Sequence, residues 1–412
     1  MSDSSKLLKN IICVAVGTCS LVMAGCGGGS SSSSGEPDVV VTPEPSPEPT
    51  PEPIVDPQPE TLVFTGEDDD ADLSEADLDV VAAEIIKLTY GRGLVETVQP
   101  YLAEMQFLEE ELLGEDGGYY FQDYSRRSTS ALDLDLETVG QNTMSGSETR
   151  AGQCGGTAEL SYESSVEQRY GEDSEVGAAW ETLLTQDSNA NFSEDYCVYD
   201  SFGDNENATV FTGTAEFAGN VSFYNDSDST EGGYDYGSFE VNAELIVDVT
   251  VSAEGLTGRY QQNKTNSGLE YADNRTDPSV YAGNGEQVDN KRLTINGQIV
   301  ESSEIHLSSY DSESEIESYT NDEILAYDGS VFLIHQLRGV SLEGGYLDLG
   351  LEASYTGYGV IFTDAQDLTF CADGSGFNTG TIEFWDAFST AATITFNGCG
   401  VAPTVALAPT EF

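Results

Sequence analysis

Strict alternation of apolar and polar residues is the feature that most limits the folds open to this chain. Its longest example has seven apolar residues at every second position, namely Phe239, Val241, Ala243, Leu245, Val247, Val249 and Val251. The residues between them are polar except Ile246. A period of two puts the apolar set on one face of an extended chain. The pattern therefore predicts a long antiparallel strand with one face in a core and the other in water.

Similar alternation recurs at Leu293–Ile299, Leu347–Tyr355 and Ala392–Phe396. A short motif, GT[AI]E[LF], occurs at residues 156–160, 213–217 and 380–384. Its unequal spacing indicates one type of strand reused within a sheet rather than a regular solenoid. We predict a mainly β fold, a large antiparallel sheet or a sandwich.

A helical pattern precedes the strands. Ser74 and Asp77 resemble a capping box, and apolar residues follow at helical spacing. Gly91 and Gly93 interrupt this pattern, and a second amphipathic stretch runs over residues 100–114. The expectation is a short N-terminal helical hairpin that packs on the sheet.

The first 25 residues are typical of a signal peptide. A basic start is followed by an apolar run, Ile11–Met23, that is too short to span a membrane. The run ends in Met23-Ala24-Gly25-Cys26, which resembles the lipobox of bacterial lipoproteins, with Met23 where Leu is usual. The resemblance implies that Cys26 becomes the first mature residue and carries a lipid such as palmitate. By the same resemblance, Gly27 favours the outer membrane of a Gram-negative host.

The chain divides by composition into four parts. After the signal peptide, residues 26–60 form a Gly/Ser/Pro-rich tether. Its Pro/Glu-rich part favours extended polyproline II, so about 25 residues at ~3.1 Å each could reach roughly 75 Å. Residues 61–118 are the acidic helical segment, and residues 119–412 are the antiparallel β domain.

The mature chain, which begins at Cys26, holds five of the seven cysteines, and assigning Cys26 to the lipid leaves Cys154, Cys197, Cys371 and Cys399. An even number in an oxidising compartment predicts two disulfides, with three possible pairings. We favour Cys154–Cys197 and Cys371–Cys399 because each pair brackets a GT[AI]E[LF] strand and its return strand. The chain lacks CxxC, which argues against zinc.

The net charge of the chain limits the kinds of partner that it can bind. The chain has 14 Lys and Arg against 74 Asp and Glu, a formal charge of −60. Such a surface repels nucleic acid, so binding to a phosphate backbone is excluded as a function. The acidity favours solubility, and divalent cations are the alternative interpretation.

Calcium is the one cofactor that the sequence suggests. Oxygen ligands stand at the spacing of an EF-hand loop at Asp187, Asn189, Asn191 and Asp195. The match fails where the loop needs Gly, at Phe192, and where a Glu should close it, at Val198.

Catalytic residues are scarce. The only histidines are His306 and His335, and neither accompanies a GxSxG nucleophile motif. A glycosidase needs two nearby carboxylates, but in a chain with 74 Asp and Glu such a pair does not indicate a catalytic site. We therefore expect a protein that is not an enzyme. Aromatic residues at Tyr119–Phe121 and Tyr124 form either a binding patch or the first strand of the sheet.

The chain resembles uncharacterised β-rich lipoproteins of Gram-negative bacteria. The resemblance lies in the lipobox, the tether, the paired cysteines and glycine-centred strands such as Thr294–Gly297. These generic motifs imply an outer-membrane lipoprotein, on the periplasmic or cell-surface side, without an assigned activity. The expected function is non-enzymatic, with a β body that binds an unknown protein or glycan or serves the envelope structurally. The alternatives are a carrier of a hydrophobic ligand on a curved sheet, a lipidated outer-membrane β-barrel and an envelope hydrolase.

Overall fold

A computed structural model describes residues 57–113, 137–173, 177–199, 208–227, 236–253, 256–273, 280–312, 316–388 and 391–407. All of them lie in one compact unit, Asp56–Phe412. The described ranges contain the helix α2 (Leu78–Leu113) and fifteen strands. The strands are β1 (Glu137–Ala151), β2 (Thr157–Asp173), β3 (Gly177–Tyr199), β4 (Ala208–Ser227), β5 (Tyr236–Ala253), β6 (Leu256–Asp273), β7 (Val280–Ile295), β8 (Gln298–Asp311), β9 (Ile316–Tyr327), β10 (Ser330–Glu343), β11 (Tyr346–Tyr355), β12 (Gly359–Phe370), β13 (Phe377–Trp385), β14 (Ala391–Thr395) and β15 (Thr404–Leu407).

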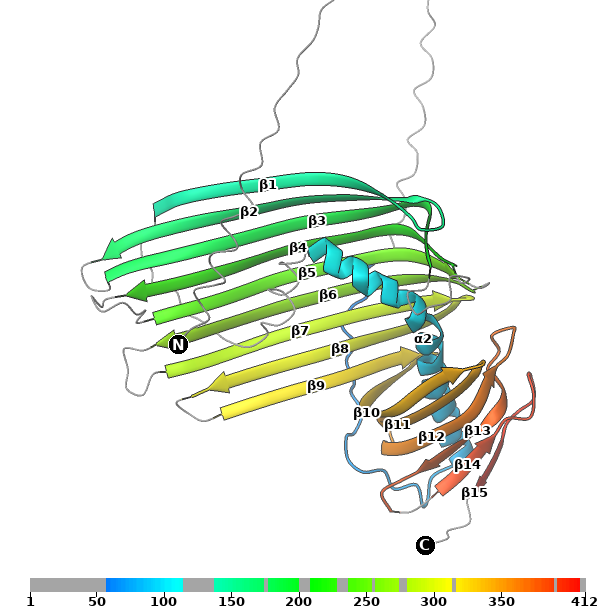
Figure 1. The fold of residues 1–412 in the computed structure, drawn as a ribbon. Helices are drawn as coiled ribbons and strands as arrows, with labels where there is room; N and C mark the ends of the chain where they lie inside the picture. The colour runs from blue at the N-terminus through cyan, green and yellow to red at the C-terminus, as the bar shows by residue number, and fades with distance from the viewer. Residues whose placement is uncertain are drawn as a thin grey trace, which may run out of the picture. The chain divides into compact units, whose positions relative to one another are not determined.

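The strands form one antiparallel sheet in chain order, which confirms the mainly β prediction (Figure 1). Each strand pairs with its neighbours in the sequence, and β1 and β15 are the edges. β5 is the long alternating strand. Its even-numbered residues are partly or fully exposed, while Val241, Leu245, Val247, Val249 and Val251 are buried.

The sheet narrows between β9 and β10. Only five residue pairs join these strands, from Ser330↔Tyr327 to Ile334↔Glu323, whereas β8 and β9 pair over twelve. The described residues form two apolar cores, and the second of them extends across the narrow join. The central core is formed mainly by β2–β7, and the C-terminal core by β8–β14.

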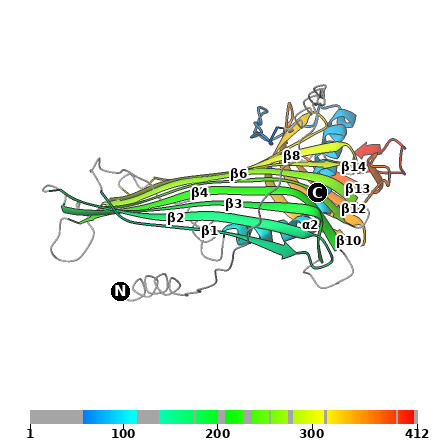
Figure 2. The ribbon, with the colours of Figure 1, turned by 90° about the horizontal axis from the view of Figure 1, so that it is seen from above.

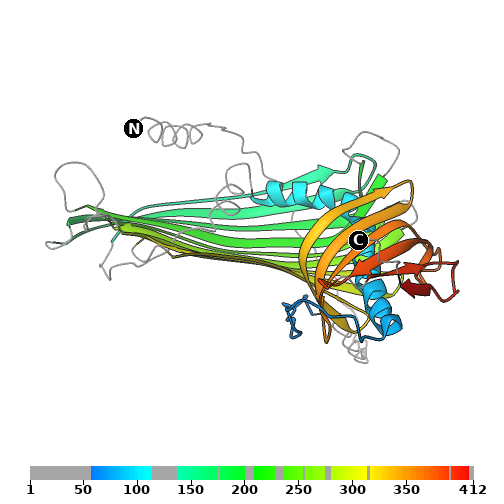
Figure 3. The same cartoon turned by 90° about the horizontal axis from the view of Figure 1, so that it is seen from below.

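The helix contacts both cores. Its first half contributes Val81, Ile85 and Leu88 to the C-terminal core, where β10–β14 curve around it (Figure 3). Val98 and Leu102 belong to the central core. Seen along the sheet, α2 lies against one face of the long strands (Figure 2). One helix thus packs on both parts of the sheet.

The predicted helical hairpin is wrong, because α2 continues through Gly91, Gly93 and Pro100. The two glycines are required by packing. A Cβ on Gly91 would lie 3.0 Å from Tyr327 Cβ, and one on Gly93 would lie 2.6 Å from Leu347 Cδ2. Proline removes one helical hydrogen bond and commonly bends a helix instead of ending it when packing holds both sides. Figure 1 shows α2 bending between the two cores.

The start of the helix also differs from the prediction. Asp77, not Ser74, is the N-cap, since its side chain accepts a hydrogen bond from Asp79 N at 3.2 Å and its carbonyl from Val81 N. Ser74 instead belongs to a turn in which its backbone N–H donates to Asp72 Oδ1 at 3.0 Å.

An extended segment, residues 57–73, precedes the helix and is called the strap below. Its first part contacts β7 and β8, where Leu62 N donates to Ser303 Oγ at 2.8 Å. Its second part reaches β12, where Val360 N donates to Asp69 O at 2.9 Å. Leu73 N then donates to Asp386 Oδ2 at 2.8 Å in a buried contact. The strap and the helix both connect the two parts of the sheet.

The alternating run Leu293–Ile299 is divided by a turn instead of forming one strand. β7 ends at Ile295 and β8 begins at Gln298. The two residues between them, Asn296 and Gly297, have φ of 51° and 78°. Two successive positive φ angles define the type I′ hairpin turn, for which Asn-Gly is the preferred sequence.

The GT[AI]E[LF] motifs begin or lie within strands, as predicted, and their glycines have a shared role. Gly156, Gly213 and Gly380 all have positive φ, at 67°, 141° and 104°. A Cβ on Gly213 would lie 2.1 Å from Asp248 O, and one on Gly380 would lie 2.6 Å from Asp367 O. The motif therefore marks places where two backbones approach too closely for a side chain.

Both favoured disulfides are present. Cys154 is bonded to Cys197, with a Cα–Cα distance of 5.1 Å, and Cys371 to Cys399, at 5.7 Å. Each bond fastens a loop beside one of the motif glycines, Gly156 and Gly380. The disulfides thus lie beside irregular places in the sheet.

Candidate functional site

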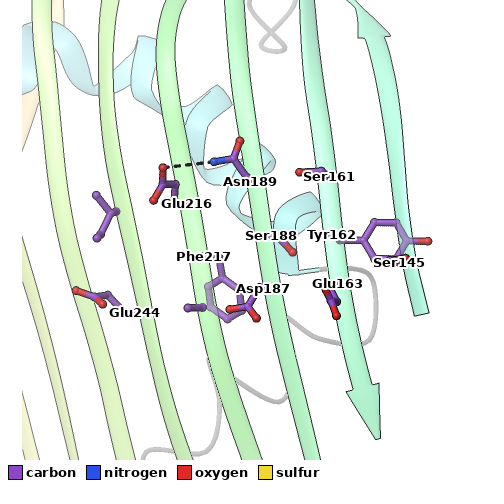
Figure 4. Close-up of a pocket in the computed structure, with 12 residues that line it drawn as sticks. Ser145, Ser161, Tyr162, Glu163, Asp187, Ser188, Asn189, Glu216, Phe217 and Glu244 are labelled. Carbon is purple, nitrogen blue, oxygen red and sulfur yellow. Dashed lines mark hydrogen bonds between the residues drawn. The ribbon is translucent and has the colours of Figure 1, made fainter. Parts of the chain in front are cut away.

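The candidate site is a pair of shallow troughs on the face of β1–β6 opposite to α2 (Figure 4). Their volumes are about 540 and 430 Å³, and they share Asp187, Ala218 and Glu244. Because they share these residues, the troughs adjoin and make one depression across the strands.

Strand register brings the lining residues together. Glu163 on β2 pairs with Asp187 on β3, and Asn189 on β3 pairs with Glu216 on β4. The alternation that buries Leu245 in the central core turns its neighbour Glu244 to this open face. Asn189 Nδ2 donates to Glu216 Oε1 at 3.4 Å, the dashed contact in Figure 4.

The lining determines which ligands fit. It contains four exposed carboxylates, Glu163, Asp187, Glu216 and Glu244, and no lysine, arginine or histidine. The side-chain hydroxyl and amide groups on this face come from Ser145, Ser161, Thr185, Asn189, Asn220, Asn242, Thr265 and Ser267. Alternation turns the side chain of Tyr162 to the other face, in register with Ser188 and Phe217. Such a surface offers acceptors to hydroxyl and amine donors and repels anions.

The calcium loop predicted at residues 187–195 is wrong, because this segment is part of strand β3. Asp187, Asn189 and Asn191 alternate along the strand, so neighbouring members of the set are about 7 Å apart and cannot surround one ion. Asp195 lies in the bulge between Phe192 and Tyr196, with φ of 66°. Within the described ranges, no group of three or more His, Cys, Asp or Glu side chains has the arrangement of a metal site.

A Ser–His–Asp cluster that the sequence did not predict joins the strap to β10 and β11. Ser354 Oγ lies 2.7 Å from His335 Nε2 and 2.9 Å from Asp68 Oδ1. The same Asp68 oxygen is 3.0 Å from the same His335 nitrogen. In a catalytic triad, the acid and the serine contact opposite nitrogens of the ring. Here they share one nitrogen and Ser354 is fully buried, so the arrangement differs from that of a catalytic triad and joins the strap to the sheet.

A second charged cluster lies under α2. Asp289, Glu304 and Glu323 stand side by side on β7, β8 and β9. Lys291 Nζ contacts Glu304 at 2.7 Å and Asp289 at 3.1 Å, while Arg92 contacts Glu323 and its helical neighbour Glu96. These contacts connect the helix to the sheet between the two cores.

Two acids of this cluster, Glu323 and Glu304, have pKa values shifted in opposite directions. Burial raises the pKa of Glu323 above its usual value, an effect that Arg92 opposes and Glu304 reinforces. Burial would also raise the pKa of Glu304, but the charge and hydrogen bond of Lys291 lower it below its usual value. His306, the other histidine considered from the sequence, lies two residues further along β8 on the same face.

Several sequence predictions fall outside the described residues. These are the signal peptide, lipidation of Cys26, all but the last four residues of the tether, and the aromatic residues Tyr119–Phe121 and Tyr124. Within the described ranges, no helix combines the length and the apolarity that crossing a membrane requires.

Comparison with known proteins adds no further assignment. No family model matches the chain, and no curated protein or solved structure shows significant similarity to it. Functional inference therefore rests on the residues themselves.

Proposed function

We propose that this chain is a non-enzymatic lipoprotein, acylated on Cys26 and held at the outer membrane, whose β body binds a polar glycan on its open face. The anchor follows from the lipobox resemblance and the tether that separates it from the first described residue, Pro57. Lipid attachment leaves the β body free to reach ligands at a distance from the bilayer.

The adjoining troughs on β1–β6 are the observation that carries the binding proposal. Glycans present many hydroxyl groups and weakly apolar ring faces. Carboxylate oxygens such as those of Asp187 and Glu216 accept hydrogen bonds from hydroxyls, and hydrogen bonds to a charged group are the stronger ones. The apolar floor at Ala218 and Ile246 suits a sugar face. The four carboxylates disfavour sulfated, phosphorylated and uronic-acid glycans.

Two clusters support the proposal that the chain has no enzymatic activity. These are the Ser–His–Asp cluster and the charged cluster under α2. In one, Ser354 is buried and shares a single histidine nitrogen with Asp68. In the other, Glu304 and Glu323 are engaged by Lys291 and Arg92. Both clusters fasten the strap or the helix to the sheet, which is a structural role.

Binding is tested with a glycan array that contains neutral, amine-bearing and anionic oligosaccharides. We expect neutral or amine-bearing glycans to bind, and Ala218→Trp, which fills the trough, to weaken binding at least 10-fold. Thr250→Trp is the matched control, since Thr250 is exposed on the same face of β5 but does not line a trough. The proposal fails if only anionic glycans bind, if none binds, or if both tryptophan variants weaken binding equally.

Anchoring is tested separately by membrane fractionation. Cys26→Ser should move the protein from the membrane to the soluble fraction. Cys19→Ser, which changes another cysteine of the same segment, should leave it in the membrane fraction. Equal membrane retention of both variants would refute acylation of Cys26 without affecting the binding proposal.

A further inference from the structure

Among the strands that the structure describes, β1 is the longer of the two edge strands of the sheet. β1 pairs with β2 from Glu137 to Ala151, and none of the strands that the structure describes pairs with its other side. Most of its residues are exposed, including Val139 and Met144 at 56% each. A row of unpaired backbone N–H and C=O groups is a template for another strand.

Natural proteins usually protect such an edge with charged residues, proline, bulges or short length. β15, the opposite edge, is protected by having only four residues. β1 has fifteen residues, no proline and no lysine, and its one irregularity lies between Thr138 and Gly140. Residues 138–147 carry no charge at all, although the whole chain has a formal charge of −60. The exposed edge is therefore an exception to the surface around it.

We propose that two copies of this chain pair through their β1 strands, antiparallel about a twofold axis, and form one continuous sheet. The neutral stretch lets the strand meet its own copy without like charges directly opposite each other. Because both copies use the same edge, the twofold axis places one residue directly opposite its own copy, so paired residue numbers add up to an even sum. With Met144 at the axis the sum is 288, and Thr143 stands opposite Ser145.

In this register Glu148 stands opposite Gly140, whereas a register centred on Glu148 would place the two copies of that acid opposite each other, where they would repel. The pairing is isologous, so each favourable contact at one end of the interface recurs at the other.

Salt should strengthen the dimer. The acids of β2, such as Glu163, lie about three strand spacings, ~14 Å, from their counterparts across the joined edge. Repulsion over that distance is largely screened at 0.15 M salt, where the Debye length is ~8 Å, but not at 0.01 M, where it is ~30 Å. An interface held together mainly by ion pairs would show the opposite dependence.

The test measures the mass of the full-length Cys26→Ser chain by sedimentation equilibrium at 0.15 M salt. The expected mass is twice 44.1 kDa. Met144→Glu places a charge at the centre of the interface and should raise the Kd at least 10-fold, while Met144→Gln should leave it unchanged. Leu407→Glu, the same charge added to the exposed edge strand β15, is the second control. Unchanged circular dichroism of Met144→Glu establishes that its fold is intact.

The register is tested by cross-linking. Met144→Cys should form a disulfide-linked dimer on mild oxidation, because the residue at the twofold axis stands directly opposite its own copy and opposed strand residues have suitable Cα separations. A monomer at tens of micromolar would overturn the proposal, as would a dimer that Met144→Glu does not weaken. A dimer that is weakened by Met144→Glu but does not cross-link would overturn the antiparallel register.

Discussion

Gly93→Ala tests the close packing of α2 on the C-terminal core. At an exposed helical position, replacing glycine by alanine stabilises a protein by about 1 kcal/mol. At Gly93 the new Cβ would lie 2.6 Å from Leu347 Cδ2 and 2.9 Å from Phe370 Cζ. Leu347 is fully buried and has little freedom to move. Overpacking of this kind costs about 1–3 kcal/mol, so we expect a net loss of about 1 kcal/mol.

The measurement is the free energy of unfolding from urea titrations followed by circular dichroism. Ala83→Gly is the reference, because Ala83 is exposed on the same helix and should lose about 1 kcal/mol through helix propensity alone. In a Leu347→Ala background the clash is relieved, and Gly93→Ala should become stabilising. If Gly93→Ala stabilises the natural sequence by about 1 kcal/mol, the close contact between helix and sheet is refuted.

Two further predictions concern the disulfides and the charged cluster. Replacing Cys154 and Cys197 by serine should lower the free energy of unfolding by up to about 4 kcal/mol in the chain-entropy model, since the cysteines are 43 residues apart; equal urea midpoints for the variant and the parent would contradict this. Because the pKa of Glu323 is raised in the folded state, the folded protein binds this proton more readily than the unfolded chain. Its contribution to stability is therefore present below pH 4.5 and is lost as the pH rises through the raised pKa. Glu323→Gln should remove this part of the pH dependence of the melting temperature, and an unchanged slope between pH 4 and 7 would be evidence against it.

The sequence predicted the parts of the fold that depend on local pattern. Alternation identified β5 and its buried face, because a strand with one wet face needs no distant partner to be recognised. The cysteines paired as expected because each pair brackets a GT[AI]E[LF] strand and its return strand. The run Leu293–Ile299 was predicted as part of one alternating pattern, although its Asn296-Gly297 pair is typical of a turn. The type I′ turn at these two residues places the apolar residues before and after it on different strands.

Other features depended on packing that sequence spacing does not contain. Gly91 and Gly93 look like helix breakers until their contacts with Tyr327 and Leu347 are known. The cluster of Asp68, His335 and Ser354 joins residues up to 286 positions apart, so no local motif announces it. The troughs likewise depend on the register of β2–β5, which brings together carboxylates that are unremarkable singly in so acidic a chain.

The long reach of the strap has a consequence for how the molecule is built. β1 to β15 pair only with neighbours in the sequence, so the sheet can grow strand by strand as the chain leaves the ribosome or a translocation channel. The strap cannot follow that order, since Leu62 bonds to Ser303 and Leu73 to Asp386, 241 and 313 residues later. The segment that emerges first is therefore the last to find its place. Until then, the apolar side of α2 and the core surface it will cover stay open to water, and this interval is when the nascent protein most needs protection from aggregation.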